Sequence, residues 1–165
     1  MGTGYKLVVV LHILCAIVGF GAIALDSLYA AQTRRFRGPE AHAVAQAHYA
    51  ATAKVSEPFL YALPVLGILA VLLSSSGAKI SMGDSWVSMS FLVYIATLGV
   101  LHGMVRPARR KALVLLGELA GAQNSGGAQP SQTATLAKLG QKLSLGSALI
   151  NLLLVIAVIL MVFKP

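Results

Sequence analysis

The chain has 165 residues, of which 57% are hydrophobic and only 11% are charged. Soluble domains usually carry about 25% charged residues, so this composition excludes an ordinary soluble domain and is typical of a membrane protein. The length allows one domain, and a single cysteine excludes an internal disulfide. The formal net charge of +8 raises the question of nucleic-acid binding, which the positions of the basic residues answer below.

The first apolar stretch runs from Leu7 to Ala31 and is interrupted by two ionisable residues, His12 and Asp26. A helix of this length would extend for ~37 Å, which exceeds the ~30 Å of bilayer hydrocarbon. A basic cluster follows at residues 33–37, as at a membrane surface. We therefore predict a membrane helix over residues 7–31.

Three further membrane helices are predicted, at residues 58–73, 86–104 and 143–163. The predicted fold class is therefore all-α: a polytopic four-transmembrane-helix bundle in which residues 1–165 form a single membrane domain. Pro64 should bend the second helix unless a neighbour satisfies the carbonyl that it leaves free.

The segments between these helices are expected to extend beyond the membrane. Residues 40–55 are rich in alanine and only weakly apolar, so we predict a helix there at the membrane surface. Ser56-Glu57-Pro58 either starts a new helix or kinks a continuous one. The fourth helix is predicted to begin near Thr133, after a flexible linker at residues 122–131.

Basic residues are concentrated in two of the inter-helix segments, 32–57 and 105–142. The positive-inside rule places these segments in the cytoplasm and both termini outside, in a multi-pass protein of the bacterial plasma membrane. Because this distribution follows from membrane topology, it gives no support to nucleic-acid binding. The ten basic residues of the two segments are Arg34, Arg35, Arg37, Lys54, Arg106, Arg109, Arg110, Lys111, Lys138 and Lys142, against Lys6, Lys79 and Lys164 on the other side.

Four polar residues are predicted to form a cluster near the cytoplasmic boundary of the bundle: Asp26, Glu57, His102 and Arg106. A buried carboxylate is costly unless it is paired, so Arg106 or His102 is the expected partner of Asp26. The cluster is interpreted as a structural ion pair that fixes the helix arrangement. The alternative is a proton-accepting or quinone-contacting site.

His12 is predicted to lie in the other leaflet, with Cys15 one turn away and Tyr94 or Asn151 nearby. It is interpreted as a hydrogen-bonded interior residue, with haem ligation or a proton relay as alternatives. Because His102 belongs to the opposite leaflet, these two histidines cannot both be axial ligands of one haem.

The remaining histidines, His42 and His48, are six residues apart, which is about 120° around a helix. They do not form an i,i+4 metal-binding pair, and both are predicted to be solvated. The sequence has no nucleophile–base set, no phosphate-binding loop and no CxxC motif. No catalytic residue and no metal site are therefore assigned, and whether the protein is an enzyme is left open.

Small residues mark the helix faces that are expected to pack. Gly19 lies on the face of the first helix that carries the ionisable residues, and Gly99 and Gly103 form a GxxxG spacing in the third. A stripe of small and polar residues in the fourth helix, which includes Ser147 and Asn151, is predicted to pack on the first helix. The opposite face of the first helix is predicted to face lipid, through Val10, Ile13, Ile17 and Leu25.

The chain resembles a group of small four-helix bacterial integral membrane proteins of unknown function, mostly from actinobacteria. The resemblance rests on LHILCAIVGFGAIALDSLYAAQTRR, a second helix that opens with a glutamate, and VLHGMVRPARR. More distantly, the LHI start of the first helix resembles HemJ-type protoporphyrinogen oxidases and copper-resistance-D-type proteins. In the HemJ type an early histidine is implicated in haem b binding, and His12 matches it by position.

Two functions are consistent with these observations. The first is a non-catalytic integral membrane subunit or accessory factor of a larger complex, for instance a respiratory one, with other membrane subunits and the lipid bilayer as partners. The second is a haem b- or quinone-linked membrane redox protein that uses His12 with Asp26, Glu57 and His102. The small size, the small-residue helix faces and the lack of a catalytic constellation favour the first.

Overall fold

The computed structural model describes residues 2–33, 35–36, 38–74, 80–122 and 130–163. These residues are helical almost throughout, and none of them forms a strand. The elements in chain order are α1 (Thr3–Ala24), α2 (Asp26–Thr33), α3 (Pro39–Ala51), the π-helical segment η1 (Thr52–Ser56), α4 (Glu57–Leu73), α5 (Ser85–Val100), the π-helical segment η3 (Leu101–Val105), α6 (Arg106–Ala122) and α7 (Pro130–Phe163).

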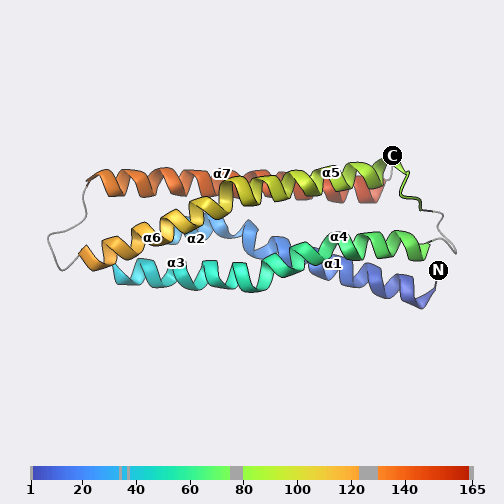
Figure 1. The fold of residues 1–165 in the computed structure, drawn as a ribbon, viewed down its shortest axis with the longest axis horizontal. Helices are drawn as coiled ribbons and strands as arrows, with labels where there is room; N and C mark the ends of the chain where they lie inside the picture. Colours follow the sequence, from blue (N-terminus) through green and yellow to red (C-terminus); the bar gives the residue numbers. More distant parts are fainter. Residues whose placement is uncertain (1, 34, 37, 75–79, 123–129, 164–165) are drawn as a thin grey trace.

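The elements build four long rods. α1 is the first; α3, η1 and α4 continue into one another as the second; α5, η3 and α6 form the third; α7 is the fourth. Each rod is long and apolar enough to cross a membrane. Together they form an elongated bundle in which the start of α1 and the end of α7 lie at the same end (Figure 1). The predicted all-α bundle with four membrane helices is confirmed.

The first membrane helix differs from the prediction at both ends. α1 begins at Thr3 and ends at Ala24, and Leu25 forms a turn before α2 begins at Asp26. The prediction of one helix over residues 7–31 is therefore wrong. The turn places Asp26 at the first position of a new helix, where a negative charge is favourable, and its carboxylate is fully buried.

The second rod passes through Glu57 without interruption, so the continuous helix is the observed one of the two alternatives. Pro64 lies inside α4 and has no N–H to donate to the carbonyl of Leu60, one turn earlier. The hydroxyl of Tyr94, on α5, donates to this carbonyl at 3.3 Å. A neighbouring helix thus satisfies the group that the proline leaves free.

Tyr94→Phe is expected to destabilise the protein by about 1–2 kcal/mol, because it leaves the Leu60 carbonyl unsatisfied. The cost should shrink in a Pro64→Ala background, since the alanine restores the backbone N–H that this carbonyl lacks. The measurement is a double-mutant cycle on the free energy of unfolding in mixed detergent micelles. An equal cost of Tyr94→Phe in both backgrounds would contradict this role of the hydroxyl.

Two glycines allow close helix contacts. A Cβ at Gly19 of α1 would lie 3.0 Å from the backbone nitrogen of Leu60 on α4. A Cβ at Gly146 of α7 would lie only 2.5 Å from Cγ2 of Val105 in η3. Gly146 is a packing residue that was not predicted from the small-residue stripe of the fourth helix.

Gly99 and Gly103 do not pack helices within the described chain. A Cβ at either position would meet no atom within 4 Å, and both residues are exposed. They lie on the outward side of the third rod, so their predicted role in helix packing stays a prediction that only a partner outside this chain could fulfil. In α7, the Ser147 hydroxyl donates to the carbonyl of Ile23 at 3.1 Å, which is the expected contact with the first helix. A packing role for the half-buried Asn151 stays a prediction.

One half of the bundle presents an apolar outer surface. α1, α4, α5 and the second half of α7 expose large aliphatic side chains along their length. The predicted lipid-facing residues of the first helix are 45–63% exposed, so they lie on the outside of the bundle: Val10, Ile13, Ile17 and Leu25. The other half of the bundle contains α2, α3, α6 and the start of α7 (Figure 1).

The sidedness of the protein, with the termini outside and segments 32–57 and 105–142 in the cytoplasm, stays a prediction. Residues 123–129, most of the predicted linker, lie outside the described residues. So do four of the basic residues on which the prediction of sidedness depends: Arg34, Arg37, Lys79 and Lys164.

Candidate functional site

A cluster of buried charged side chains lies where the membrane half of the bundle meets the other half. Four elements supply it: the start of α2, the end of α3, the start of α4 and the first turn of α6. Arg106 is 21 residues beyond the start of α5 at Ser85, which corresponds to ~31 Å along a helix. A helix that enters the membrane at Ser85 would therefore cross the ~30 Å of bilayer hydrocarbon close to the height of the cluster.

Asp26 is the centre of the cluster and is 0% exposed. Nε2 of His48 donates to its Oδ1 at 2.7 Å. Nε of Arg109 donates to its Oδ2 at 3.0 Å, and a second guanidinium nitrogen of Arg109 reaches the same oxygen. A carboxylate with a guanidinium and an imidazole as partners is compensated for the loss of water.

Glu57 is the second buried carboxylate, at 2% exposure. Nε of Arg106 donates to its Oε1 at 3.2 Å, and another Arg106 nitrogen contacts Oε2. Nη1 of Arg109 lies 3.5 Å from Oε1 of Glu57, so Arg109 bridges the two carboxylates. The cluster thus sets two carboxylates against two guanidinium groups and one imidazole.

Aromatic rings cover the cluster. The ring of Tyr29 stacks on that of His48, with centroids 3.8 Å apart and an angle of 14° between the planes. The guanidinium carbon of Arg109 lies 5.8 Å from the centroid of the Tyr49 ring. The hydroxyl of Thr52 donates to the carbonyl of His48 at 3.0 Å. The imidazole of His48 is thus held by the stacked ring of Tyr29 on its face and by the carboxylate of Asp26 at Nε2.

The cluster is complete as it stands. Every buried side-chain nitrogen and oxygen in the described part of the chain has a hydrogen-bond partner. The same residues include no group of three His, Cys, Asp or Glu arranged to hold a metal ion. A saturated ionic cluster supports the structural interpretation better than the proton-accepting or quinone-contacting one.

The structure corrects the predicted membership of the cluster. The partners of Asp26 are Arg109 and His48, so the expected pairing with Arg106 or His102 is wrong. His102 lies outside the cluster: it is exposed, its Nδ1 donates to the carbonyl of Leu98 at 3.0 Å, and its Nε2 accepts from the hydroxyl of Tyr61 at 2.9 Å. His48, predicted to be solvated, is only 9% exposed.

The spacing of alanine and leucine residues in each helix could have identified the two cluster residues that were not predicted, His48 and Arg109. His48 lies three and seven residues after the buried Ala45 and Ala41 on one face of α3. Arg109 lies three residues before Ala112 and seven before Leu116, which are also buried. In each helix, alanine or leucine positions define the inward face, and the charged residue falls on it.

Both π-helical segments end beside this cluster. η1 directly precedes Glu57, and η3 directly precedes Arg106. A π-helical turn holds about one residue more than an α-helical turn. The residues that follow it therefore face a different direction from the one that a regular α-helix would give them. The two segments therefore set which side chains of α4 and α6 face the carboxylates and guanidinium groups of the neighbouring rods.

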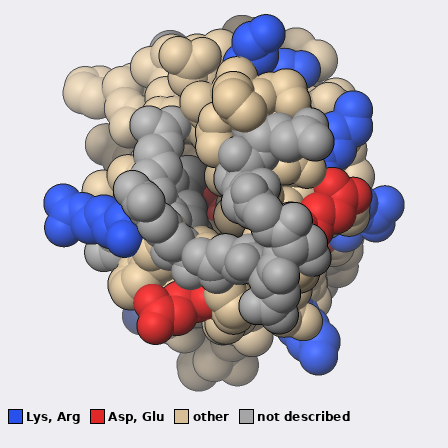
Figure 2. All heavy atoms as spheres, turned by 90° about the vertical axis from the view of Figure 1, so that its left-hand side faces the viewer, with Lys and Arg blue, Asp and Glu red and all other residues tan. Residues whose placement is uncertain are grey.

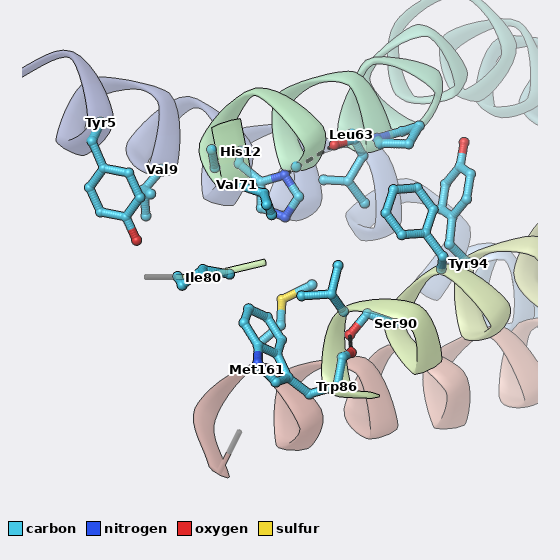
Figure 3. A pocket seen from close by; sticks show the side chains of 15 residues that line it. Tyr5, Val9, His12, Leu63, Val71, Ile80, Trp86, Ser90, Tyr94 and Met161 are labelled. Atoms are coloured by element: carbon cyan, nitrogen blue, oxygen red, sulfur yellow. Dashed lines mark hydrogen bonds between the residues drawn. The ribbon is translucent and has the colours of Figure 1, made fainter. Parts of the chain in front are cut away.

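A second feature is an apolar cavity of about 230 Å³ at the other end of the membrane half (Figure 3). Its walls come from α1, α4, α5, the end of α7 and Ile80. Nδ1 of His12 contacts the carbonyl of Leu63 at 3.1 Å, and the ring lies against Gly67, whose Cβ would be 3.2 Å from Cε1 of His12. His12 precedes Asp26 by 14 residues, or ~21 Å of helix. The cavity and the ionic cluster are therefore separate sites.

The basic residues outside the membrane half are dispersed. Viewed along the bundle from the end that carries the start of α3, Lys and Arg side chains project at several separate places around the circumference (Figure 2). Such a distribution suits contact with lipid headgroups around the whole bundle. It differs from the one-sided basic stripe that is typical of nucleic-acid binding.

Four apolar rods, an outer surface of aliphatic side chains and a charged cluster at the boundary define a multi-pass integral membrane protein that sits in the lipid bilayer. The family model described as "Predicted integral membrane protein (DUF2269)" matches residues 6–165. The chain therefore belongs to this family of integral membrane proteins of unknown function, in agreement with the resemblance found in the sequence. Comparisons with curated proteins and with solved structures found no match.

Proposed function

We propose that this protein is a non-catalytic subunit or accessory factor that binds a larger complex in the bacterial plasma membrane through the outer surface of α4, α5 and η3. The surface consists of Gly99, Gly103, His102 and Tyr61, and we call it the α5 surface. Gly99 and Gly103 leave backbone accessible for the close approach of another helix.

The observation that carries this proposal is a polar pair exposed at membrane depth. His102 is 17 residues beyond the start of α5 at Ser85, or ~26 Å along the helix, which is within the ~30 Å hydrocarbon layer. His102 and Tyr61 bond to each other at 2.9 Å, yet both are exposed on the outside of the bundle. Polar side chains at this depth usually face protein rather than lipid. A partner helix on the two adjacent glycines would cover them.

The test is purification from native membranes in a mild detergent at physiological expression. We expect a partner membrane protein in stoichiometric amount, and loss of that partner in the double variant Gly99→Leu, Gly103→Leu. Gly21→Leu on α1 is the matched control, since Gly21 is also exposed and its Cβ would meet no atom within 4 Å. Recovery of a lone monomer, or retention of the partner by the double variant, would contradict the proposal. The identity of the partner decides whether the complex is respiratory.

The second candidate, a haem b- or quinone-linked redox protein, is supported by the position of His12 on the cavity wall. A cavity of about 230 Å³ falls below the ~300 Å³ of the smallest usual drug-sized sites, so it suits a single ring better than a haem macrocycle. His102, Asp26 and Glu57 lie far from His12 along the bundle, toward the ionic cluster, so they cannot act together with His12 on one small ligand. In this second hypothesis, only the cavity around His12 remains as a possible redox-ligand site.

A further inference from the structure

The cavity beside His12 combines an apolar wall with one hydrogen-bonding nitrogen. Most of its lining is aliphatic or aromatic, and the aromatic rings come from both sides: Tyr5 of α1 on one, and Trp86, Phe91 and Tyr94 of α5 on the other. The His12 ring points into the space between them (Figure 3). Such a space accepts a flat ring and orients it through a small number of polar contacts.

The hydrogen bond of His12 determines what the free ring nitrogen can do. A carbonyl oxygen only accepts, so Nδ1 of His12 carries the proton that it donates to Leu63 at 3.1 Å. In a neutral imidazole, Nε2 is then an acceptor. In the described part of the chain no protein group bonds to Nε2, which faces the cavity (Figure 3). A ligand that pairs with this nitrogen must therefore donate a proton.

We propose that this cavity binds the hydroxylated ring of a lipid-soluble quinol or related phenol that enters from the bilayer. The hydroxyl of the ligand donates to Nε2 of His12, and the ring lies between the aromatic side chains of α1 and α5. A lipid acyl chain would fill the same volume but would leave Nε2 without a partner, which is unfavourable in an apolar site. The ligand arrives through lipid because the cavity lies within the membrane half of the bundle.

Two structural features keep the His12 ring in this position. Gly67 leaves room for the ring, since a Cβ there would lie 3.2 Å from Cε1 of His12. The carbonyl of Leu63 fixes the orientation of the imidazole and the nitrogen that carries the proton. The site is independent of the α5 surface, so either proposal can fail without the other.

Tryptophan fluorescence of the purified full-length protein in detergent micelles tests this site. The chain has one tryptophan, and Trp86 lines the cavity. The probes are decyl-benzoquinol, kept reduced without oxygen, and its dimethyl ether, which has the same ring and tail but no hydroxyl. We expect saturable binding of the quinol and about tenfold weaker binding of the ether, the usual effect of one buried hydrogen bond.

Two variants separate the hydrogen bond from the cavity. His12→Phe should weaken quinol binding about tenfold and leave ether binding unchanged, whereas Ile13→Phe, the control at an exposed position of the same helix, should change neither. Val71→Phe narrows the cavity and should weaken both probes. Equal affinity for quinol and ether, or no saturable signal, overturns the proposal, and this comparison in the unmodified protein remains decisive even where His12→Phe does not fold.

Discussion

Arg109→Ala is expected to lower the free energy of unfolding by about 3–5 kcal/mol, because it removes the cation that bridges two buried carboxylates. Asp26 would keep only His48, and Glu57 would keep only Arg106. An uncompensated charge in a buried site costs more than the intact pair contributes, so the loss should be far larger than for a surface ion pair.

The matched control is the next residue. Arg110→Ala removes the same side chain from an exposed position on the same helix and should change the stability by no more than about 0.5 kcal/mol. The measurement is reversible unfolding in mixed detergent micelles, followed by circular dichroism. Similar losses for Arg109→Ala and Arg110→Ala would show that the cluster does not hold the two halves of the bundle together.

Gly146→Leu is expected to destabilise the bundle by about 3 kcal/mol, because α7 and η3 are in contact at this position. A Cβ alone would already lie 2.5 Å from Cγ2 of Val105, so a larger side chain must push the two rods apart. Val105→Ala in the same chain should recover part of the loss, since it removes the methyl group that the new side chain meets.

Gly99→Leu is the control for this substitution. It adds the same side chain at a glycine whose Cβ would meet no atom within 4 Å, and the isolated protein should keep its stability within about 0.5 kcal/mol. The comparison uses unfolding midpoints of the purified variants in one detergent. If Gly99→Leu were the more damaging of the two, the assigned contact between α7 and η3 would be incorrect.

The number of membrane helices could be predicted from the sequence because long apolar stretches have few alternatives in a chain of this composition. Asp26 and Glu57 could also be predicted to lie at a similar height in the bundle, since distance along a helix is fixed by its rise. The side chains that pair with Asp26 and Glu57 could not be predicted. Arg106 and Arg109 differ by three residues and lie on nearly the same face, so depth alone does not distinguish them.

Periodicity can place His48 on the inward face of α3, but it does not identify what that face contacts. α3 runs beside α6, and no pattern within α3 specifies that neighbour. The two π-helical segments change the helical phase just before Glu57 and Arg106, so a regular α-helical count misplaces the residues across them. The cavity around His12 requires side chains from all four rods, and their relative heights come only from packing.

The π-helical segments act as spacers that set the helical phase of the second and third rods. An α-helix turns ~100° per residue, and a π-helical turn takes up about one residue more than an α-helical turn. Deleting one residue between Thr52 and Ser56 would let that segment become α-helical and would leave Glu57 facing nearly as before relative to His48. Within these five-residue windows, a single deletion is therefore expected to be better tolerated than a deletion elsewhere in the same rods, which would rotate the residues that follow by about a quarter turn.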